Sequence, residues 1–78
     1  MNNNMVSHPA HYTQGGIECI DAIRASMSAD EFAGFLKGNA MKYLWRYRHK
    51  GKAAEDLKKS NWYINRLIRH LEEGRKNE

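Results

Sequence analysis

The chain has 78 residues, and its 13 Lys and Arg residues outnumber its 9 Asp and Glu residues to give a net charge of +4. A chain of this length makes one domain with a modest core, so we expect it to assemble as a homo-oligomer. One cysteine excludes an internal disulfide, and because no apolar run approaches the roughly 20 residues of a membrane span, we predict no membrane partner.

The N-terminal residues 1–7 are polar, and we expect a disordered tail there. His8, His11 and Tyr12 follow around the only proline, in a stretch closed by Gly15–Gly16, which predicts an ordered loop. His-x-x-His alone supplies too few ligands for zinc, so we predict no metal site and assign both histidines to hydrogen bonding. Tyr12 either stacks on a ligand or packs.

Three helices are predicted after this loop, and they make an all-α fold. Apolar residues at helical spacing indicate a short helix over 17–26, in which Cys19 is expected to be buried. A capping box of Ser28 and Glu31 starts a second helix, whose apolar stripe reaches Tyr47. The third helix runs from about 53 to 73, and its predicted buried stripe contains Leu57, Ser60 or Asn61, Ile64, Leu67, Ile68 and Leu71. Residues 8–73 thus form a single helical domain, and 74–78 a frayed tail.

The second helix should end near Gly51, for which we predict a left-handed cap conformation. The loop that follows is short, so the second and third helices should pack as an antiparallel hairpin. Gly34 and Gly38 lie four residues apart inside the second helix. Such a pair indicates either close helix packing or backbone that lies beside a ligand.

The segment 38–52 carries five of the thirteen basic residues, three aromatic residues and no acid. Cations of one sign among aromatic rings suit a ligand that has phosphates to neutralise and a base to stack on. Lys42, Trp45, Arg46 and His49 share one helix face, on which Lys and Arg could hold phosphate and Trp45 could stack on a base or enter an oligomer interface. The alternative is a solvated basic face with a half-buried tryptophan.

On the third helix, Lys59, Tyr63 and Arg66 share one face, which would form an anion cleft if it lies beside the basic face of the second helix. Trp62 lies off this face, and we assign it to the core. The paired acids Glu18 with Asp21 and Glu55 with Asp56 are too few for the magnesium cage of all-α nucleoside triphosphate pyrophosphatases. Asp56 is instead expected to form a salt bridge with Lys42 or Arg46.

Several short motifs occur in a fixed order along the chain. They are His8-Pro9-x-His11-Tyr12, Gly16-Ile17-Glu18-Cys19-Ile20-Asp21, Gly38-Asn39-Ala40-x-Lys42-Tyr43-Leu44-Trp45-Arg46-Tyr47, Lys50-Gly51, Glu55-Asp56-Leu57-Lys58-Lys59 and Trp62-Tyr63. Together they resemble a family of small bacteriophage proteins catalogued as domain of unknown function 3310. The resemblance covers residues 6 to about 68. Some members are described as nucleotide kinases that phosphorylate deoxynucleoside monophosphates, so it implies a phage origin, a host cytoplasmic location and a nucleotide ligand.

The resemblance also implies which residues bind the nucleotide. Lys42, Arg46 and Lys50 are assigned to the phosphates, and His8, His11 and Asn39 to polar contacts with sugar, base or phosphate. The expected nucleotide-binding set is completed by Tyr12, Trp45 and Lys59. Replacement of Arg46 by Ala is expected to weaken nucleotide binding and to leave the fold intact.

Three functional classes stay open. The first is a nucleoside monophosphate kinase-type phosphotransferase, which would use magnesium. The second is a non-catalytic sponge that sequesters an immune-signalling nucleotide, and the third is an inhibitor of a host protein. The chain has no Gly-x-x-x-x-Gly-Lys-Ser/Thr loop and no Gly-x-Gly-x-x-Gly, which counts against an ordinary kinase, and we assign no catalytic residue. Duplex nucleic acid is disfavoured because acids interrupt any long basic stripe.

Overall fold

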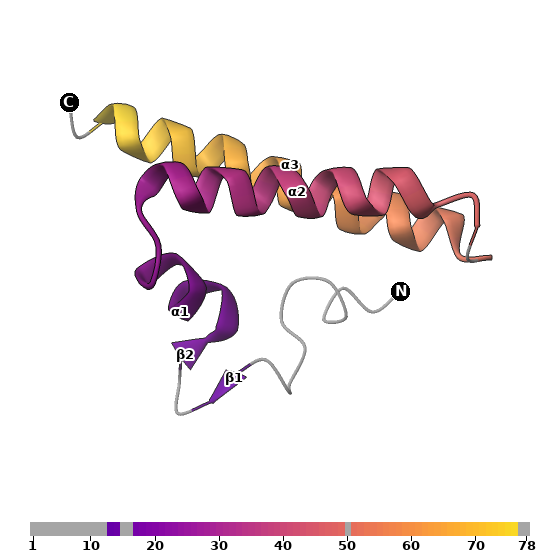
Figure 1. Cartoon of the computed structure of the whole chain (residues 1–78), viewed down its shortest axis with the longest axis horizontal. Coiled ribbons are helices and arrows are strands. Elements are labelled where there is room, and N and C mark those ends of the chain that lie inside the picture. Colours follow the sequence, from indigo (N-terminus) through magenta and orange to yellow (C-terminus); the bar gives the residue numbers. More distant parts are fainter. Residues whose placement is uncertain (1–12, 15–16, 50, 77–78) are drawn as a thin grey trace.

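The computed structural model describes residues 13–14, 17–49 and 51–76 (Figure 1). The elements in chain order are β1 (Thr13–Gln14), β2 (Ile17–Glu18), α1 (Cys19–Ala25), α2 (Ala29–Arg46) and α3 (Ala53–Lys76). The predicted all-α class is confirmed, because the three helices form the body of the described chain. The predictions for residues 1–12 and for Lys50 lie outside the described residues.

The first helix begins later than predicted because the two residues before it belong to a strand. β1 and β2 pair antiparallel, with Thr13 opposite Glu18 and Gln14 opposite Ile17. Glu18 keeps an extended backbone, with φ −80° and ψ 145°, and serves as the N-cap of α1. Cys19 is exposed, so the prediction that it is buried is wrong. The short helix α1 buries none of its own residues fully.

The start of α2 and the turn after it follow the local signals in the sequence. The Ser28 hydroxyl accepts a hydrogen bond from the Glu31 backbone N–H at 3.1 Å, and the Glu31 carboxylate accepts one from the Ser28 N–H at 2.8 Å. This reciprocal pair confirms the predicted capping box. Gly51 has a φ of 74°, a left-handed conformation that glycine adopts at little cost, as predicted.

The helices α2 and α3 lie side by side in opposite directions, which confirms the predicted hairpin (Figure 1). Phe32, Leu36 and Ala40 of α2 form its apolar core. Two hydrogen bonds tie the helices together away from their connecting loop. The Ser60 hydroxyl donates to the Ala40 carbonyl at 2.8 Å, and His70 Nε2 donates to the Ala29 carbonyl at 2.9 Å.

The prediction for the buried stripe of α3 is confirmed for Ser60, which is 2% exposed, but is wrong for four of its aliphatic members. The predicted members Leu57, Ile64, Ile68 and Leu71 are 40–54% exposed. The buried side chains of α3 are Asp56, Ser60 and Arg66. Buried polar groups require partners, and the partners of Asp56 and Ser60 lie on α2. These interactions fix the rotation of α3 about its axis, and in this orientation the aliphatic stripe faces outward. We call Leu57, Ile64, Ile68 and Leu71 the outer stripe.

Three further findings complete the fold. α3 continues through Gly74 to Lys76, beyond the end at residue 73 that periodicity predicts. A Cβ atom built on Gly34 or Gly38 would meet nothing within 4 Å, so packing among the described residues does not require glycine at either position. No helix in the described ranges is long and apolar enough to cross a bilayer.

Candidate functional site

Three cations from two helices gather around the ring of Tyr43. Lys42 Nζ lies 4.6 Å from the ring centroid, Arg46 Cζ 4.8 Å, and Lys59 Nζ of α3 5.4 Å. The negative face of an aromatic ring attracts cations and holds them near one another despite their repulsion. We call Lys42, Tyr43, Arg46 and Lys59 the Tyr43 cluster. The hairpin thus unites three of the predicted site residues that are up to 17 positions apart in sequence.

One of the three cations already has an anionic partner within the fold. Arg46 Nε and Nη2 each donate to a carboxylate oxygen of Asp56 at 3.3 Å, which confirms the predicted salt bridge. Asp56 is only 1% exposed, so this carboxylate depends on Arg46 for its charge compensation. Arg46 is therefore a candidate structural residue as well as a candidate ligand, and the ion pair argues against the expectation that Arg46→Ala leaves the fold intact.

An aromatic series continues from the Tyr43 cluster along the hairpin. The Tyr43 ring stacks on Tyr63 of α3, with centroids 6.0 Å apart and planes 11° apart. Tyr63 in turn makes an edge contact with Trp62 at 5.0 Å and 87°. Stacked and edge-to-face pairs of this kind stabilise one relative orientation of the rings. The Tyr43 ring, around which the three cations lie, is therefore held in one orientation by its aromatic neighbours.

Of the other predicted site residues, two lie in the described part of the chain and four lie outside it. Asn39 uses its side-chain amide to donate to the Phe35 carbonyl at 2.9 Å, one helical turn earlier, and is partly buried. Trp45 is 83% exposed, so the structure does not bring it into the aromatic core. His8, His11, Tyr12 and Lys50 lie outside the described residues. Within the described part of the chain there is no group of three or more His, Cys, Asp or Glu side chains that could hold a metal ion.

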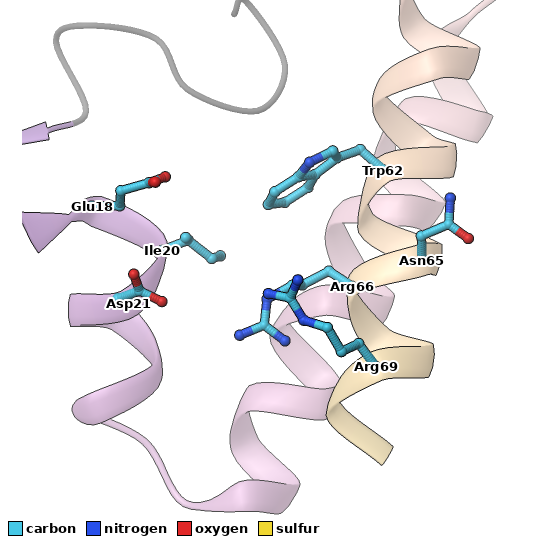
Figure 2. Close-up of a pocket in the computed structure, with 7 residues that line it drawn as sticks. All are labelled: Glu18, Ile20, Asp21, Trp62, Asn65, Arg66 and Arg69. Atoms are coloured by element: carbon cyan, nitrogen blue, oxygen red, sulfur yellow. The ribbon is translucent and has the colours of Figure 1, made fainter. Parts of the chain in front are cut away.

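Sequence reasoning missed a pocket that lies away from the Tyr43 cluster. A pocket of about 250 Å³ lies between the β2–α1 junction and α3 (Figure 2). It is lined by Glu18, Ile20, Asp21, Trp62, Asn65, Arg66 and Arg69. The helical spacing predicts that Arg66 and Lys59 share one face of α3. In the structure, however, Lys59 lies near Tyr43, whereas Arg66 lines the pocket beside α1. Trp62, which we assigned to the core, is half-buried and lines this pocket.

The electrostatics of this pocket centre on Arg66, which is only 6% exposed. Burial lowers the pKa of its guanidinium, and the nearby Arg69 lowers it further, while Glu73 and Asp21 act in the opposite direction. Two basic and two acidic side chains line the same space, so it carries no net excess of either sign. No run of like charge in the sequence could therefore have revealed it.

Comparison with known proteins places the chain beside phage proteins. Residues 6–65 match the family of proteins of unknown function catalogued as DUF3310. The gene 1.7 protein of Enterobacteria phage T3 is 36% identical over 69 residues, an alignment that covers 83% of this chain and 42% of that protein. The nucleotide kinase gp1.7 of Escherichia phage T7 is 35% identical over 69 residues, with 83% of this chain and 35% of that protein covered.

The chain thus spans less than half the length of either relative. No solved structure is significantly similar to it. The similarity covers all three helices in part or whole, including the Tyr43 cluster, because the family match extends from residue 6 to residue 65.

Proposed function

The chain belongs to the DUF3310 family, and from this premise we propose that it is a phage protein that binds a nucleotide in the host cytoplasm, with the phosphates at the Tyr43 cluster. One observation carries the proposal: Lys42, Arg46 and Lys59 converge on a single ring from two different helices. Three adjacent cations repel one another, and a bound phosphate would relieve that repulsion while it accepts their hydrogen bonds.

Within the Tyr43 cluster, we assign the direct phosphate contacts to Lys42 and Lys59. Arg46 is paired with Asp56, so its charge is partly compensated, whereas each lysine contributes an ammonium group with three donors. Lysine binds phosphate as a mobile point charge, which suits a ligand that arrives and leaves. Arg46 would then add a more distant positive charge and hold the geometry of the α2–α3 seam.

The name of the T7 relative, nucleotide kinase gp1.7, favours phosphotransfer among the three functional classes. In such a reaction, an oxygen of a nucleoside monophosphate attacks the γ-phosphorus of a nucleoside triphosphate. The bond from that phosphorus to the β–γ bridging oxygen breaks, and two nucleoside diphosphates result. Catalysis of this step depends mainly on positioning and charge neutralisation, which clustered lysines provide. We assign no catalytic residue, and magnesium would accompany the triphosphate.

One experiment separates the three classes. The protein is incubated with a deoxynucleoside monophosphate, ATP and magnesium, and in parallel with a cyclic nucleotide of the kind used in immune signalling; the solution and the recovered, denatured protein are then both analysed by chromatography. New diphosphates would identify a phosphotransferase, whereas release of the unaltered nucleotide would identify a sponge. Absence of any retained or altered nucleotide would contradict the proposal and favour a host protein as the partner.

A pair of variants ties the result to the Tyr43 cluster. Lys42→Met/Lys59→Met removes both direct phosphate contacts and should weaken nucleotide binding by about 2–4 kcal/mol, since hydrogen bonds to charged groups contribute about 1.5–3 kcal/mol each and are not fully additive. Lys37→Met is the matched control, because Lys37 is an exposed lysine of the same helix. Equal affinity in both variants would remove the Tyr43 cluster from the binding site.

We also propose that the chain functions as a homo-oligomer, and the outer stripe supports this. Its four aliphatic side chains recur along one flank of α3, at spacings of seven, four and three residues. Such a row is typical of helices that pack against a further helix. A second copy of the chain offers the same row, so a symmetric contact would bury both.

A further inference from the structure

The pocket between the β2–α1 junction and α3 has two chemically different walls. In Figure 2, Trp62, Arg66 and Arg69 extend from α3, while Glu18, Ile20 and Asp21 lie on the facing segment. The two guanidinium groups lie together at one end of the space, and the indole of Trp62 lies above them. The pocket therefore presents cations, an aromatic ring and carboxylates to any molecule that enters it.

Arg66 is the reason to regard this pocket as a binding site. Its side chain is 94% buried, yet its Nε and Nη1 have no hydrogen-bond partner among the described residues. The guanidinium lies 5.3 Å from the Phe32 ring centroid, a contact that positions it but satisfies none of its donors. A buried guanidinium without acceptors is costly, and such groups in native proteins are usually compensated by a ligand, an ion or a partner chain.

Arg69 strengthens the requirement for an anion. Its guanidinium lies beside that of Arg66 in Figure 2, and its ion pair with Glu73 is long, at 3.9 Å, and largely solvent-exposed. Two adjacent guanidinium groups repel each other, and an oxyanion between them would relieve the repulsion and accept planar, paired hydrogen bonds. The chemistry of this end of the pocket therefore favours phosphate or carboxylate.

The rest of the pocket narrows the class of ligand. Trp62 offers an aromatic surface, and its edge contact with Tyr63 holds the indole in place. Asp21 and Glu18 would repel a simple anion but accept hydrogen bonds from N–H or O–H groups. A volume of about 250 Å³ is close to the lower limit of ligand pockets, so the occupant is no larger than a mononucleotide.

We propose that this pocket is a second ligand site, separate from the Tyr43 cluster, that binds a small phosphorylated molecule with an aromatic ring and hydrogen-bond donors, such as a mononucleotide. Arg66 and Arg69 bind the phosphate, Trp62 contacts the ring, and Asp21 and Glu18 accept from its donors. The proposal stands on the pocket itself and does not require that the Tyr43 cluster binds anything.

Trp62 supplies a direct optical test, because the chain has only two tryptophans. In a Trp45→Phe background, all tryptophan emission comes from Trp62. The probes are the four deoxynucleoside 5′-monophosphates and orthophosphate. We expect at least one monophosphate to change the Trp62 emission in a saturable way, with orthophosphate binding more weakly. If none of the five probes changes the emission, the proposal is overturned.

Variants at Arg66 separate ligand binding from a structural role. Arg66→Met in this background should weaken the monophosphate that binds by about tenfold or more, because it removes a charged, forked donor. Arg66→Lys keeps the positive charge but lacks the paired guanidinium donors, and it replaces Arg66→Met in the test if that variant fails to fold. Lys37→Met removes the same charge from an exposed site and should change affinity less than twofold. Unchanged affinity in the Arg66 variants would overturn the proposal.

Two further outcomes decide the matter. Ligand-free Arg66→Met should have a higher Tm than its parent, because a buried guanidinium whose Nε and Nη1 lack acceptors is replaced by an apolar chain. A lower Tm would mean that Arg66 is paired within the fold, which contradicts the proposal. Lys42→Met/Lys59→Met distinguishes the two sites: loss of the Trp62 response in that variant would assign the response to the Tyr43 cluster instead.

Discussion

On α3, the buried inner face carries polar side chains and the exposed outer stripe carries apolar ones, which is the reverse of a typical surface helix. The inner face meets α2 and α1 with Asp56, Ser60, Tyr63 and Arg66, whereas the neighbouring outer stripe is aliphatic and 40–54% exposed. A helix of a self-contained domain buries its apolar face and exposes its polar one. The difference fits the two proposals made above, in which the polar face of α3 organises candidate ligand sites and its apolar flank contacts a second copy of the chain.

The polar inner face stabilises the hairpin through specific partners and not through apolar area. Asp56 has Arg46, and Ser60 has the Ala40 carbonyl. Such pairs contribute little when complete but are costly to break, because the remaining group is buried without compensation. The inner face should therefore be sensitive to single substitutions in the monomer, whereas the outer stripe should be sensitive only in the assembly.

The largest effect is expected for Arg46→Ala. It leaves the Asp56 carboxylate buried without its cation, and we expect a loss of about 3 kcal/mol in the free energy of unfolding, measured by urea denaturation. Arg48→Ala is the control, because Arg48 is an exposed arginine of the turn that follows α2. Similar stability of the two variants would mean that the inner face does not depend on the ion pair.

The next effect concerns the outer stripe. Ile68→Lys places a charge within it and should weaken self-association by about 2 kcal/mol, as at an interface hot spot, with little change in monomer unfolding. Sedimentation velocity over a range of concentrations measures this. Ala54→Lys adds the same charge at an exposed position outside the stripe. An unchanged sedimentation coefficient, or a parent chain that is already monomeric, would refute the proposed assembly surface.

A smaller effect is expected for Ser60→Ala on the inner face. The substitution removes the donor to the Ala40 carbonyl but leaves the methylene group in place, so it should lower the free energy of unfolding by about 1 kcal/mol. Thermal denaturation would measure it. A neutral result would indicate that helix packing alone sets the rotation of α3.

The smallest effect is expected for Arg24→Gln at the surface. Its ion pair with Glu73 is 4.0 Å long, both side chains are about half exposed, and Glu73 keeps its contact with Arg69. Exposed pairs of this kind contribute less than about 1 kcal/mol, so the change in unfolding free energy should be near the limit of measurement. A loss comparable to that of Arg46→Ala would show that α1 is held mainly by charge.

The sequence predicted those features that depend on residues close together in the chain. Ser28 with Glu31 forms the capping box three positions apart, and Gly51 lies in the short turn between two strongly periodic segments. The hairpin follows from the length of that turn, and the pairing of Asp56 with Arg46 follows from the hairpin. These inferences need only local propensity and one helix contact.

The rotation of α3 and the pocket between the β2–α1 junction and α3 depend on information that periodicity does not contain. The aliphatic spacing of Leu57, Ile64 and Ile68 identifies an apolar flank but not what covers it. Arg66 meets α1 residues about 45 positions earlier in the chain, and the charges of the pocket are balanced. Neither a local pattern nor a charge run could therefore have placed Trp62 and Arg66 in a common site.

The exposed thiol of Cys19 has a practical consequence. It is the single cysteine of the chain and lies between Glu18 and Ile20, both of which line the pocket. An accessible thiol can be alkylated by a maleimide, so one environment-sensitive dye could be attached next in sequence to two pocket residues without any background labelling. The native chain therefore already contains a unique position for a spectroscopic reporter, and no engineered cysteine would be needed.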